Sequence, residues 1–304
     1  MGRGSYTAGD WASLRSSRKL NAVSTVESIF TNNCAVSAYD SRNVVIRESR
    51  DSEEHNSSTP VIIGFDVTAS MGYLAKTLAT ETINYSVNQI IHSSLSNPQF
   101  LIAAIGDVKC DNTPLQVTQF ESDIRINTQL MELHLEGGGG GNGGESYNLL
   151  WWFAAKHTST DAFEKRGKKG FLFTIGDDNC HEGLSVVEIG KAFRDTVPYS
   201  VSNQELIAMA EEKYHVIHIH INNGTPESRK IFRNLRDILP GKATEININD
   251  LDCLSYLISS IVKIRLGASA GDVMSEIPQE AAVKLARSIS FAFNDNRSGG
   301  SLFF

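Results

Sequence analysis

The sequence predicts an α/β fold in which a doubly wound, mostly parallel central sheet is flanked by helices. Short, almost wholly apolar runs alternate along the chain with longer stretches whose apolar residues recur at helical spacing. Strands that lack a polar face are typical of parallel sheets covered by helices on both sides. The length of 304 residues allows one such domain with extensions, or two small domains.

Strands and helices follow one another through most of the chain. The third expected strand is short, which favours a place at the edge of the sheet. We expect strands at 61–66, 100–107, 115–121, 170–177, 215–222 and 243–249. We expect helices at 72–95, 146–159, 202–214, 227–239, 250–266 and 277–293. Ser202, with Glu205 three residues later, is typical of a capping box at a helix start.

Composition along the chain predicts three parts. Residues 1–59 are polar and mixed, and we expect a partly helical extension with Thr7 as an N-cap and Asp10 as its capping-box partner. The α/β domain is expected over 60–265. Residues 266–304 are expected to form a C-terminal helix and a flexible tail.

Charge and cysteine usage exclude several function classes. The formal net charge of −7 argues against a nucleic-acid partner, which usually requires a basic patch. The four cysteines are far apart and form no C-x-x-C pair, so neither a zinc ribbon nor a disulfide framework is indicated. The sequence shows no signal peptide and no apolar run of about 18 residues. We therefore expect a soluble cytoplasmic protein.

Three predicted strands end in an aspartate, namely Asp66, Asp107 and Asp177. Because ligands bind at the carboxyl ends of parallel strands, these carboxylates are expected at one edge of the sheet. Asp66 also begins a D-x-T-x-S run with Thr68 and Ser70. One carboxylate and two hydroxyls form the hard-oxygen set that Mg²⁺ prefers. The same side chains could instead cap the following helix, and Asp107 is interpreted as a supporting group or a cap.

A glycine-rich loop lies between the second and third of these aspartates. Seven of the eight residues at 137–144 are glycine, and Glu145 follows them. Such a loop permits unusual backbone conformations and a close approach of the backbone to a ligand.

In this order, the D-x-T-x-S run, the glycine loop and the later aspartate resemble a von Willebrand factor A (vWA) domain that carries a metal-ion-dependent adhesion site (MIDAS). The resemblance covers about 60–265 and is similar to a bacterial cytosolic subgroup. It implies a Rossmann-like sheet and one divalent cation, Mg²⁺ or else Mn²⁺ or Ca²⁺. The metal ligands that it implies are Asp66, Thr68, Ser70, Asn142, Glu145 and Asp177.

The chain departs from the family pattern in its second loop, where the usual threonine is missing. Asn142, Glu145 or a backbone carbonyl would take its place. The resemblance further implies a non-enzymatic module whose cation accepts an acidic side chain of a protein partner. By the same analogy, that partner could be an AAA+ ATPase or a component of a stress or defence complex, and self-association is possible.

An enzymatic alternative stays open at this stage. Haloacid dehalogenase phosphatases also place a nucleophilic aspartate at a strand end, and a later "GDD" segment binds Mg²⁺. Asp66 and Asp177 would take these roles, but the usual general acid is replaced by Thr68.

Other patterns have weaker interpretations. The run 139–146 lacks the lysine of a phosphate-binding loop, because Glu145 stands in its place. His218 and His220 share one face of a strand and are a possible metal pair, although half-buried structural histidines are the commoner case. Cys180 with His181 could bind zinc, but a flexible loop is the simpler interpretation. Trp151 and Trp152 are expected in the core.

Overall fold

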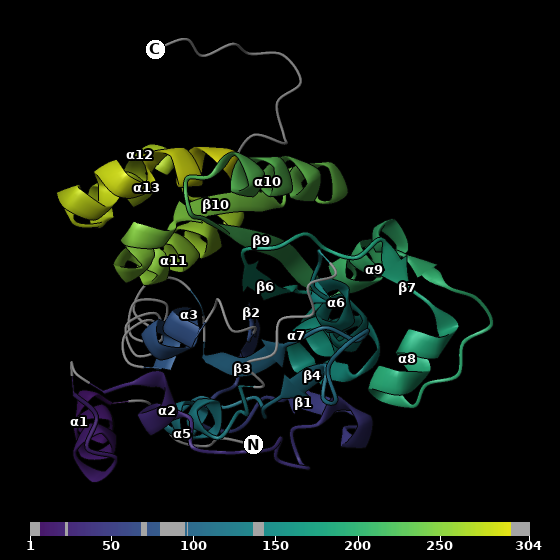
Figure 1. The fold of residues 1–304 in the computed structure, drawn as a ribbon. Helices are drawn as coiled ribbons and strands as arrows, with labels where there is room; N and C mark the ends of the chain where they lie inside the picture. The colour runs from purple at the N-terminus through teal and green to yellow at the C-terminus, as the bar shows by residue number, and fades with distance from the viewer. Residues whose placement is uncertain are drawn as a thin grey trace.

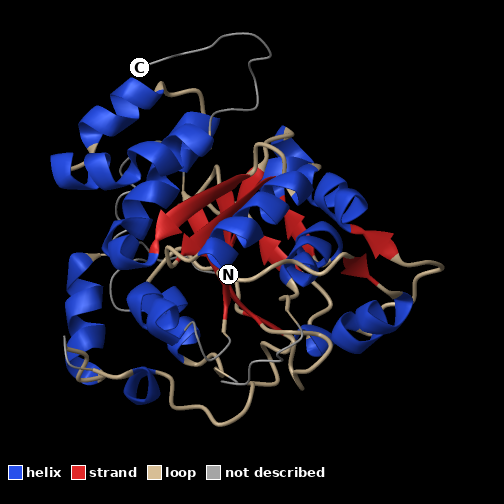
Figure 2. Cartoon of the chain, turned by 45° about the horizontal axis from the view of Figure 1, so that its top comes forward, coloured by secondary structure: helices blue, strands red, loops and turns tan. Residues whose placement is uncertain are grey.

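A computed structural model describes residues 7–21, 24–67, 72–79, 95, 97–135 and 143–292. Its centre is a six-stranded sheet in the order β10-β9-β6-β2-β3-β4 (Figures 1 and 2). The strands are β2 (Thr59–Asp66), β3 (Pro98–Ile105), β4 (Leu115–Val117), β6 (Gly170–Gly176), β9 (Tyr214–Asn222) and β10 (Ala243–Asn247). The predicted fold class is confirmed.

Five of these strands are parallel, and only the edge strand β4 is antiparallel to its neighbour. The prediction of a short third strand at an edge is therefore confirmed. From β2 the chain first adds β3 and β4 on one side, and then crosses over to add β6, β9 and β10 on the other. This reversal places a topological switch point between β2 and β6, where ligands bind in doubly wound sheets.

Helices cover both faces of the sheet, as Figure 2 shows. Alternate residues of β2 point to opposite faces, so Val61, Ile63 and Phe65 join one hydrophobic cluster while Ile62 joins the other. The first cluster includes side chains of α1 (Ala8–Ser17), α2 (Val26–Ile29), α3 (Gly72–Thr77), α5 (Arg125–Met131), α11 (Leu254–Arg265) and α13 (Gln279–Phe291). The second includes side chains of α6 (Tyr147–Lys156), α8 (Val186–Phe193), α9 (Asn203–Glu211) and α10 (Pro226–Ile238).

Two predicted helix starts are confirmed by their caps. Thr7 and Asp10 form a capping box at α1, and Ser202 and Glu205 form one at α9. The expected helix over 72–95 is described only at its beginning, as α3, because 80–94 lie outside the described residues.

Both ends of the chain share the core of the α/β domain. Trp11 and Phe30 from the N-terminal segment and Leu285 from α13 pack in the first hydrophobic cluster. Residues of β1 (Arg47–Ser49) pair in parallel with β5 (Thr158–Thr160). The domain boundaries at 59/60 and 265/266 stay a prediction, although the outer segments contribute to one continuous core.

Several short elements were absent from the predicted pattern. They are η1 (Ser41–Asn43), α7 (Asp161–Arg166), β7 (Gly183–Leu184), β8 (Val201–Ser202) and α12 (Ala270–Glu276), together with α2, β1, β5, α5 and α8. The predicted helix at 250–266 begins as the 3₁₀ helix η4 (Ile248–Cys253) and continues as α11. Elements of two to eight residues contain too few turns or alternations to produce a periodic signal.

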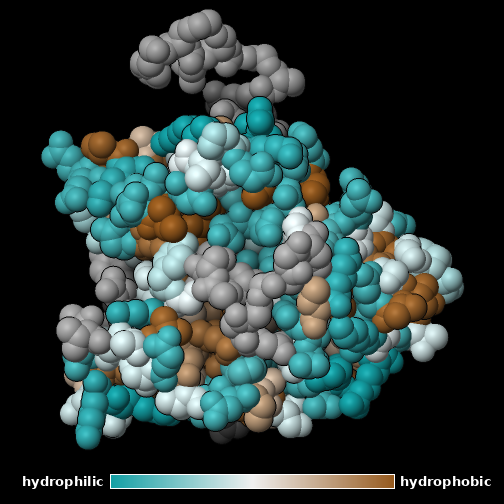
Figure 3. All heavy atoms as spheres, viewed as in Figure 1, coloured by the Kyte–Doolittle hydropathy of each residue, from teal (hydrophilic) through white to brown (hydrophobic). Residues whose placement is uncertain are grey.

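The face of the molecule seen in Figure 3 is largely hydrophilic, with scattered apolar patches. Of the helices that the structure describes, none combines the length and apolar character needed to cross a bilayer. No disulfide joins the four cysteines, all of which lie in the described ranges.

Helix α6 packs unusually close to the sheet, and Gly64 in β2 makes this possible. A Cβ atom at Gly64 would lie 2.2 Å from Cδ2 of Leu150 in α6 and 2.8 Å from Cδ1 of Ile105. Real Cβ atoms do not approach other atoms so closely, so a side chain at this position would force the side chains of Leu150 and Ile105 to shift.

We expect Gly64→Ala to lower the free energy of unfolding by about 1–3 kcal/mol, because it overpacks the contact with Leu150. Chemical denaturation measures this loss. In the double variant Gly64→Ala/Leu150→Ala, the new methyl group has room, so the total loss should be smaller than the sum of the two single losses.

Gly190 in α8 provides the control, since the nearest atom to an added Cβ is 3.7 Å away. Gly190→Ala should stabilise the protein by about 0.5–1 kcal/mol through helix propensity. If Gly64→Ala and Gly190→Ala change the free energy of unfolding equally, the close packing of α6 on Gly64 is contradicted.

Candidate metal centre

Asp66 and Asp177 lie at the carboxyl ends of the neighbouring strands β2 and β6, at the switch point of the sheet. Asp66 is the last residue of β2 and is fully buried. Asp177 directly follows the last residue of β6 and is partly buried. The two strands are neighbours in parallel register, with Phe65 opposite Ile175. The carboxyl ends of both strands therefore open at the same point of the edge.

Glu145 is held at this edge by backbone pairing with the loop that follows β6. Its N–H donates to the carbonyl of Asn179 at 2.7 Å, and its own carbonyl accepts from the N–H of His181 at 3.2 Å. These contacts form an isolated parallel bridge between Glu145 and Cys180. The end of the glycine loop is thus fixed beside the loop that carries Asp177.

The carboxyl group of Glu145 lies in an unfavourable electrostatic environment. The residue is only 5% exposed, and its Oε2 has no hydrogen-bond partner within the described residues. Burial, followed by the negative charges of Asp66 and Asp107, raises the pKa of Glu145 far above its usual range. A buried acid of this kind requires either a proton or a nearby cation.

Tyr147, the first residue of α6, joins the two strand ends. Its hydroxyl donates to Asp66 Oδ2 at 3.5 Å and accepts from the N–H of Asp178 at 3.3 Å. Burial and the charges of Asp66 and Asp177 raise the pKa of this hydroxyl well above its usual value, so it stays protonated. A Cβ at position 176 would lie 2.0 Å from the hydroxyl oxygen, which explains why a glycine ends β6.

Asp107 supports the site from the end of β3. It is buried, and its Oδ1 accepts from Ser146 Oγ at 3.2 Å and lies 3.0 Å from Nε2 of His181. Ser146 Oγ in turn accepts from the N–H of Val108 at 3.0 Å. Lys109 Nζ lies 3.1 Å from the other ring nitrogen of His181. Asp107 therefore ties the loop after β3 to the start of α6 and to the loop after β6.

Of the six predicted ligands, the structure brings Asp66, Glu145 and Asp177 to one edge of the sheet. Thr68, Ser70 and Asn142 lie outside the described residues. Within the described ranges, no group of three or more His, Cys, Asp or Glu side chains is arranged to hold a metal ion. The complete ligand set therefore stays a prediction.

Sequence reasoning missed the supporting roles of Tyr147, Ser146 and His181. Their positions next to Glu145 and in the "GDDNCHEG" segment were the available signal. Their partners are far away along the chain, and the pattern gave no indication of which aspartate each would meet.

The alternative zinc pair of Cys180 and His181 stays a prediction, and the structure gives it little support. The Cys180 thiol is buried, Asn203 Nδ2 lies 3.9 Å from it, and burial raises its pKa to about 12. Within the described residues, no group of three or more His, Cys, Asp or Glu side chains surrounds this pair. The ring of His181 is occupied by Asp107 and Lys109 instead.

His218 and His220 lie under the site as buried structural residues. His218 Nδ1 is 2.9 Å from Thr174 Oγ1, and His220 Nε2 is 2.8 Å from Ser228 Oγ. Tyr147 packs edge-on against the His218 ring with 4.8 Å between the ring centroids. Both rings are fully buried rather than half-buried, because α6 and α10 cover this face of the sheet.

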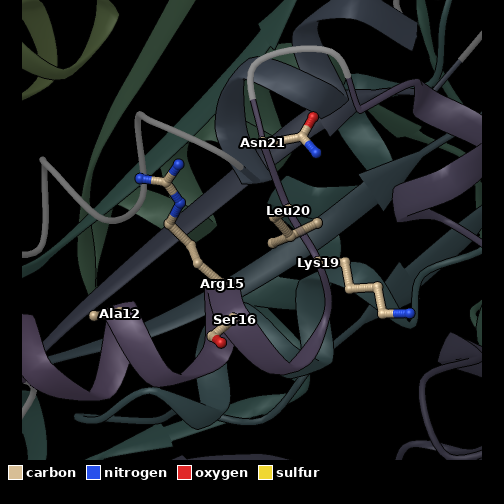
Figure 4. Close-up of a pocket in the computed structure, with 6 residues that line it drawn as sticks. All are labelled: Ala12, Arg15, Ser16, Lys19, Leu20 and Asn21. Atoms are coloured by element: carbon tan, nitrogen blue, oxygen red, sulfur yellow. The ribbon is translucent and has the colours of Figure 1, made fainter.

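A separate surface hollow of about 470 Å³ lies on α1 and the turn after it (Figure 4). Ala12, Arg15, Ser16, Lys19, Leu20 and Asn21 line it. None of the predicted ligands belongs to it, so this hollow is distinct from the edge where the carboxylates meet.

Comparison with known proteins gives distant structural neighbours only. No model of a known protein family and no curated protein matches the chain. The pilus adhesin SpaC of Lactobacillus rhamnosus GG, in its open conformation, superposes with a TM-score of 0.47 and 8% identity over 70% of this chain and 30% of the adhesin.

Two further solved structures are more distant. Proximal thread matrix protein 1 (PTMP1) of the mussel byssus, with a zinc-occupied MIDAS motif, gives a TM-score of 0.43 and 13% identity over 70% of this chain and 48% of PTMP1. An aerotolerance-related membrane protein of Bacteroides fragilis gives 0.29 and 14% over 59% of this chain and 99% of that one. The fold class rests on the strand order described above.

The buried imidazole of His218 leads to a pH prediction. Burial lowers its pKa to about 3, whereas the unfolded chain has a value of about 6.5. Below pH 6.5 the unfolded state therefore binds more protons, and the stability present at higher pH is lost as the pH falls. When the pH is lowered from 7.5 to 5, the unfolding free energy of the wild type should fall by about 2 kcal/mol more than that of His218→Asn.

Urea denaturation at several pH values measures this difference. Thr174→Val is the matched variant, because it removes the hydroxyl partner of His218 and leaves the imidazole buried. This variant should be less stable than the wild type at every pH, but its unfolding free energy should change with pH as steeply as that of the wild type. If the unfolding free energy of His218→Asn falls with pH as steeply as that of the wild type, groups other than His218 dominate the loss of stability in acid.

Proposed function

We propose that the chain is a vWA-type interaction module that binds a divalent cation at the switch point and, through it, an acidic residue of a partner protein. The strand order, the meeting of Asp66 with Asp177, and the place of Glu145 beside them support this proposal. The proposed activity is binding rather than catalysis.

The observation that carries the proposal is the buried carboxyl group of Glu145. It has no ion-pair partner within the described part of the chain, and its pKa is raised by burial and by neighbouring carboxylates. Buried acids in proteins are neutralised, paired or bound to a metal. A divalent cation would neutralise several of these charges at once.

The donor set fits a hard cation. Asp66 and Asp177 offer carboxylate oxygens at the switch point, Glu145 offers another, and Thr68, Ser70 and Asn142 are the proposed neutral oxygen ligands. Mg²⁺ is the cation that such oxygens suit best, with Mn²⁺ or Ca²⁺ as alternatives. When bound, the cation would supply a positive centre with a coordination position for an outside carboxylate.

The partner class follows from this chemistry. We propose a protein that presents an aspartate or glutamate, within a cytoplasmic, bacterial multiprotein system. An AAA+ ATPase, a component of a stress or defence complex, or a second copy of this chain would each meet that description. This part of the proposal rests on the resemblance of the site.

Metal titration tests the site. Mg²⁺ or Mn²⁺ should raise the melting temperature of the wild-type protein, because a ligand that binds only the folded state stabilises it. The double variant Asp66→Ala/Ser70→Ala should lose this rise. Glu145→Gln should also weaken it, since the amide keeps the shape of the side chain but not the charge.

Glu182→Gln is the matched control, because Glu182 is an exposed glutamate in the loop after β6. It should respond to Mg²⁺ as the wild type does. Zn²⁺ belongs in the same titration, to compare a borderline ion with the hard ones. A melting temperature that still rises with Mg²⁺ in the Asp66→Ala/Ser70→Ala protein would place the metal elsewhere.

Affinity capture with immobilised protein tests the partner. A specific partner should be retained in Mg²⁺ and released by EDTA, and an Asp66→Ala matrix should not retain it even in Mg²⁺. Retention that is unaffected by both EDTA and Asp66→Ala would refute a metal-dependent interaction.

The phosphatase alternative predicts a different result. Metal-dependent turnover of a generic phosphoester that disappears in Asp66→Asn would favour a hydrolase over the binding module. We expect no such turnover.

A further inference from the structure

Helix α10 lies beside the candidate metal centre. The parallel strand β9 ends at the carboxyl edge of the sheet, and α10 begins four residues later and packs over β9 and β10 (Figure 1). The helix therefore runs back from the carboxyl edge, and its first turns are the part nearest to that edge. Thr225 caps this end, and Pro226 occupies the first turn.

A chain of hydrogen bonds connects α10 with Glu145. Asn234 Nδ2 donates to Asn179 Oδ1 at 3.0 Å, and the carbonyl of Asn179 accepts from the N–H of Glu145 at 2.7 Å. Lys230 stands four residues before Asn234, so the two share one face of the helix. Lys230 is also one turn nearer to the carboxyl edge than Asn234 is.

This helix carries positive charge in an acidic protein. It contains four Arg or Lys residues, Arg229, Lys230, Arg233 and Arg236, against Glu227 and Asp237, while the whole chain has a net charge of −7. Two of the four are committed elsewhere. Arg229 donates to the carbonyl of Gly224, and Arg236 lies over the rings of Phe232 and Phe291.

All four side chains are exposed, and Lys230 and Arg233 are the two for which the described residues provide neither a carbonyl acceptor nor an aromatic ring. Lys230 is exposed, and its pairing with Glu227 is long, at 3.6 Å. Arg233 is exposed and has no ion-pair partner among the residues that the structure describes. An exposed ion pair of this kind contributes little, so both cations can meet a new partner at low cost.

We propose that Lys230 and Arg233 form the second half of the docking surface, and that the partner is an acidic segment with several carboxylates. One carboxylate would meet the metal, and its neighbours in the segment would meet the α10 cations. The inference rests on the proposed function, because the metal provides the first contact. It adds that a single acid is not enough for full affinity.

Charge distribution favours an acidic peptide over a nucleic acid. The carboxylates of the site would repel a continuous polyanion everywhere except at the cation, and the four cations of α10 are too few to offset this repulsion along such a chain. A short peptide can place its few carboxylates on these positive points and keep its remaining surface neutral.

Fluorescence anisotropy in Mg²⁺, with a labelled peptide that carries three glutamates separated by neutral serines, tests this proposal. Lys230→Gln/Arg233→Gln should weaken binding about fivefold, since glutamine removes the charges and preserves helix propensity. Lys168→Gln/Lys169→Gln is the matched control. It removes two exposed lysines just before β6, at the opposite edge of the sheet, and should leave the affinity unchanged.

The outcomes separate the two levels of the proposal. Suppose that peptide binding requires Mg²⁺ and Asp66, but that Lys230→Gln/Arg233→Gln and the control Lys168→Gln/Lys169→Gln bind with equal affinity. That result would overturn the role of α10 and leave the proposed function intact. Binding that survives EDTA and Asp66→Ala would overturn both. Failure of the wild type to bind the spaced-glutamate peptide, or tighter binding of a labelled oligouridylate, would overturn the acidic segment as the partner.

Discussion

The close contact between α6 and the sheet is the constraint on which the site depends. Leu150 can rest on β2 because residue 64 is glycine, and the Tyr147 hydroxyl can reach the strand ends because residue 176 is glycine. With α6 held at this distance, Glu145 immediately before it arrives at the carboxyl edge between β2 and β6. Packing in the core therefore determines where a carboxylate at the surface edge is placed.

The same packing buries several carboxyl groups at one edge of the sheet. Asp66, Asp107 and Glu145 are all nearly fully buried, and burial together with the charges of the two aspartates raises the pKa of Glu145. Tyr147, Ser146 and His181 relieve part of this repulsion by hydrogen bonding. The Oε2 atom of Glu145 keeps no hydrogen-bond partner among the described residues, so the hydrogen bonds leave this carboxyl group without compensation.

The main sheet could be predicted because each of its strands is a buried apolar run with a clear boundary. The helix caps Thr7 and Ser202 could also be predicted from the sequence, because a capping box joins residues only three positions apart. Elements such as α8 and the β1–β5 pair were not predicted. The β1–β5 pair joins segments that are far apart along the chain and so gives no local periodicity, whereas α8 begins with a capping box of Ser185 and Glu188, a local signal that the predicted pattern did not include.

The sequence by itself determined the fold class and the edge of the sheet at which Asp66 and Asp177 lie. Each aspartate follows an apolar strand, and the carboxyl ends of parallel strands lie at the same edge. Tertiary structure alone decided what surrounds them. Tyr147 meets Asp66 across 81 residues, and His181 meets Asp107 across 74. Those pairings are set by how α6 and the loops pack over the sheet, and packing of this kind depends on side-chain shape rather than on any repeating pattern.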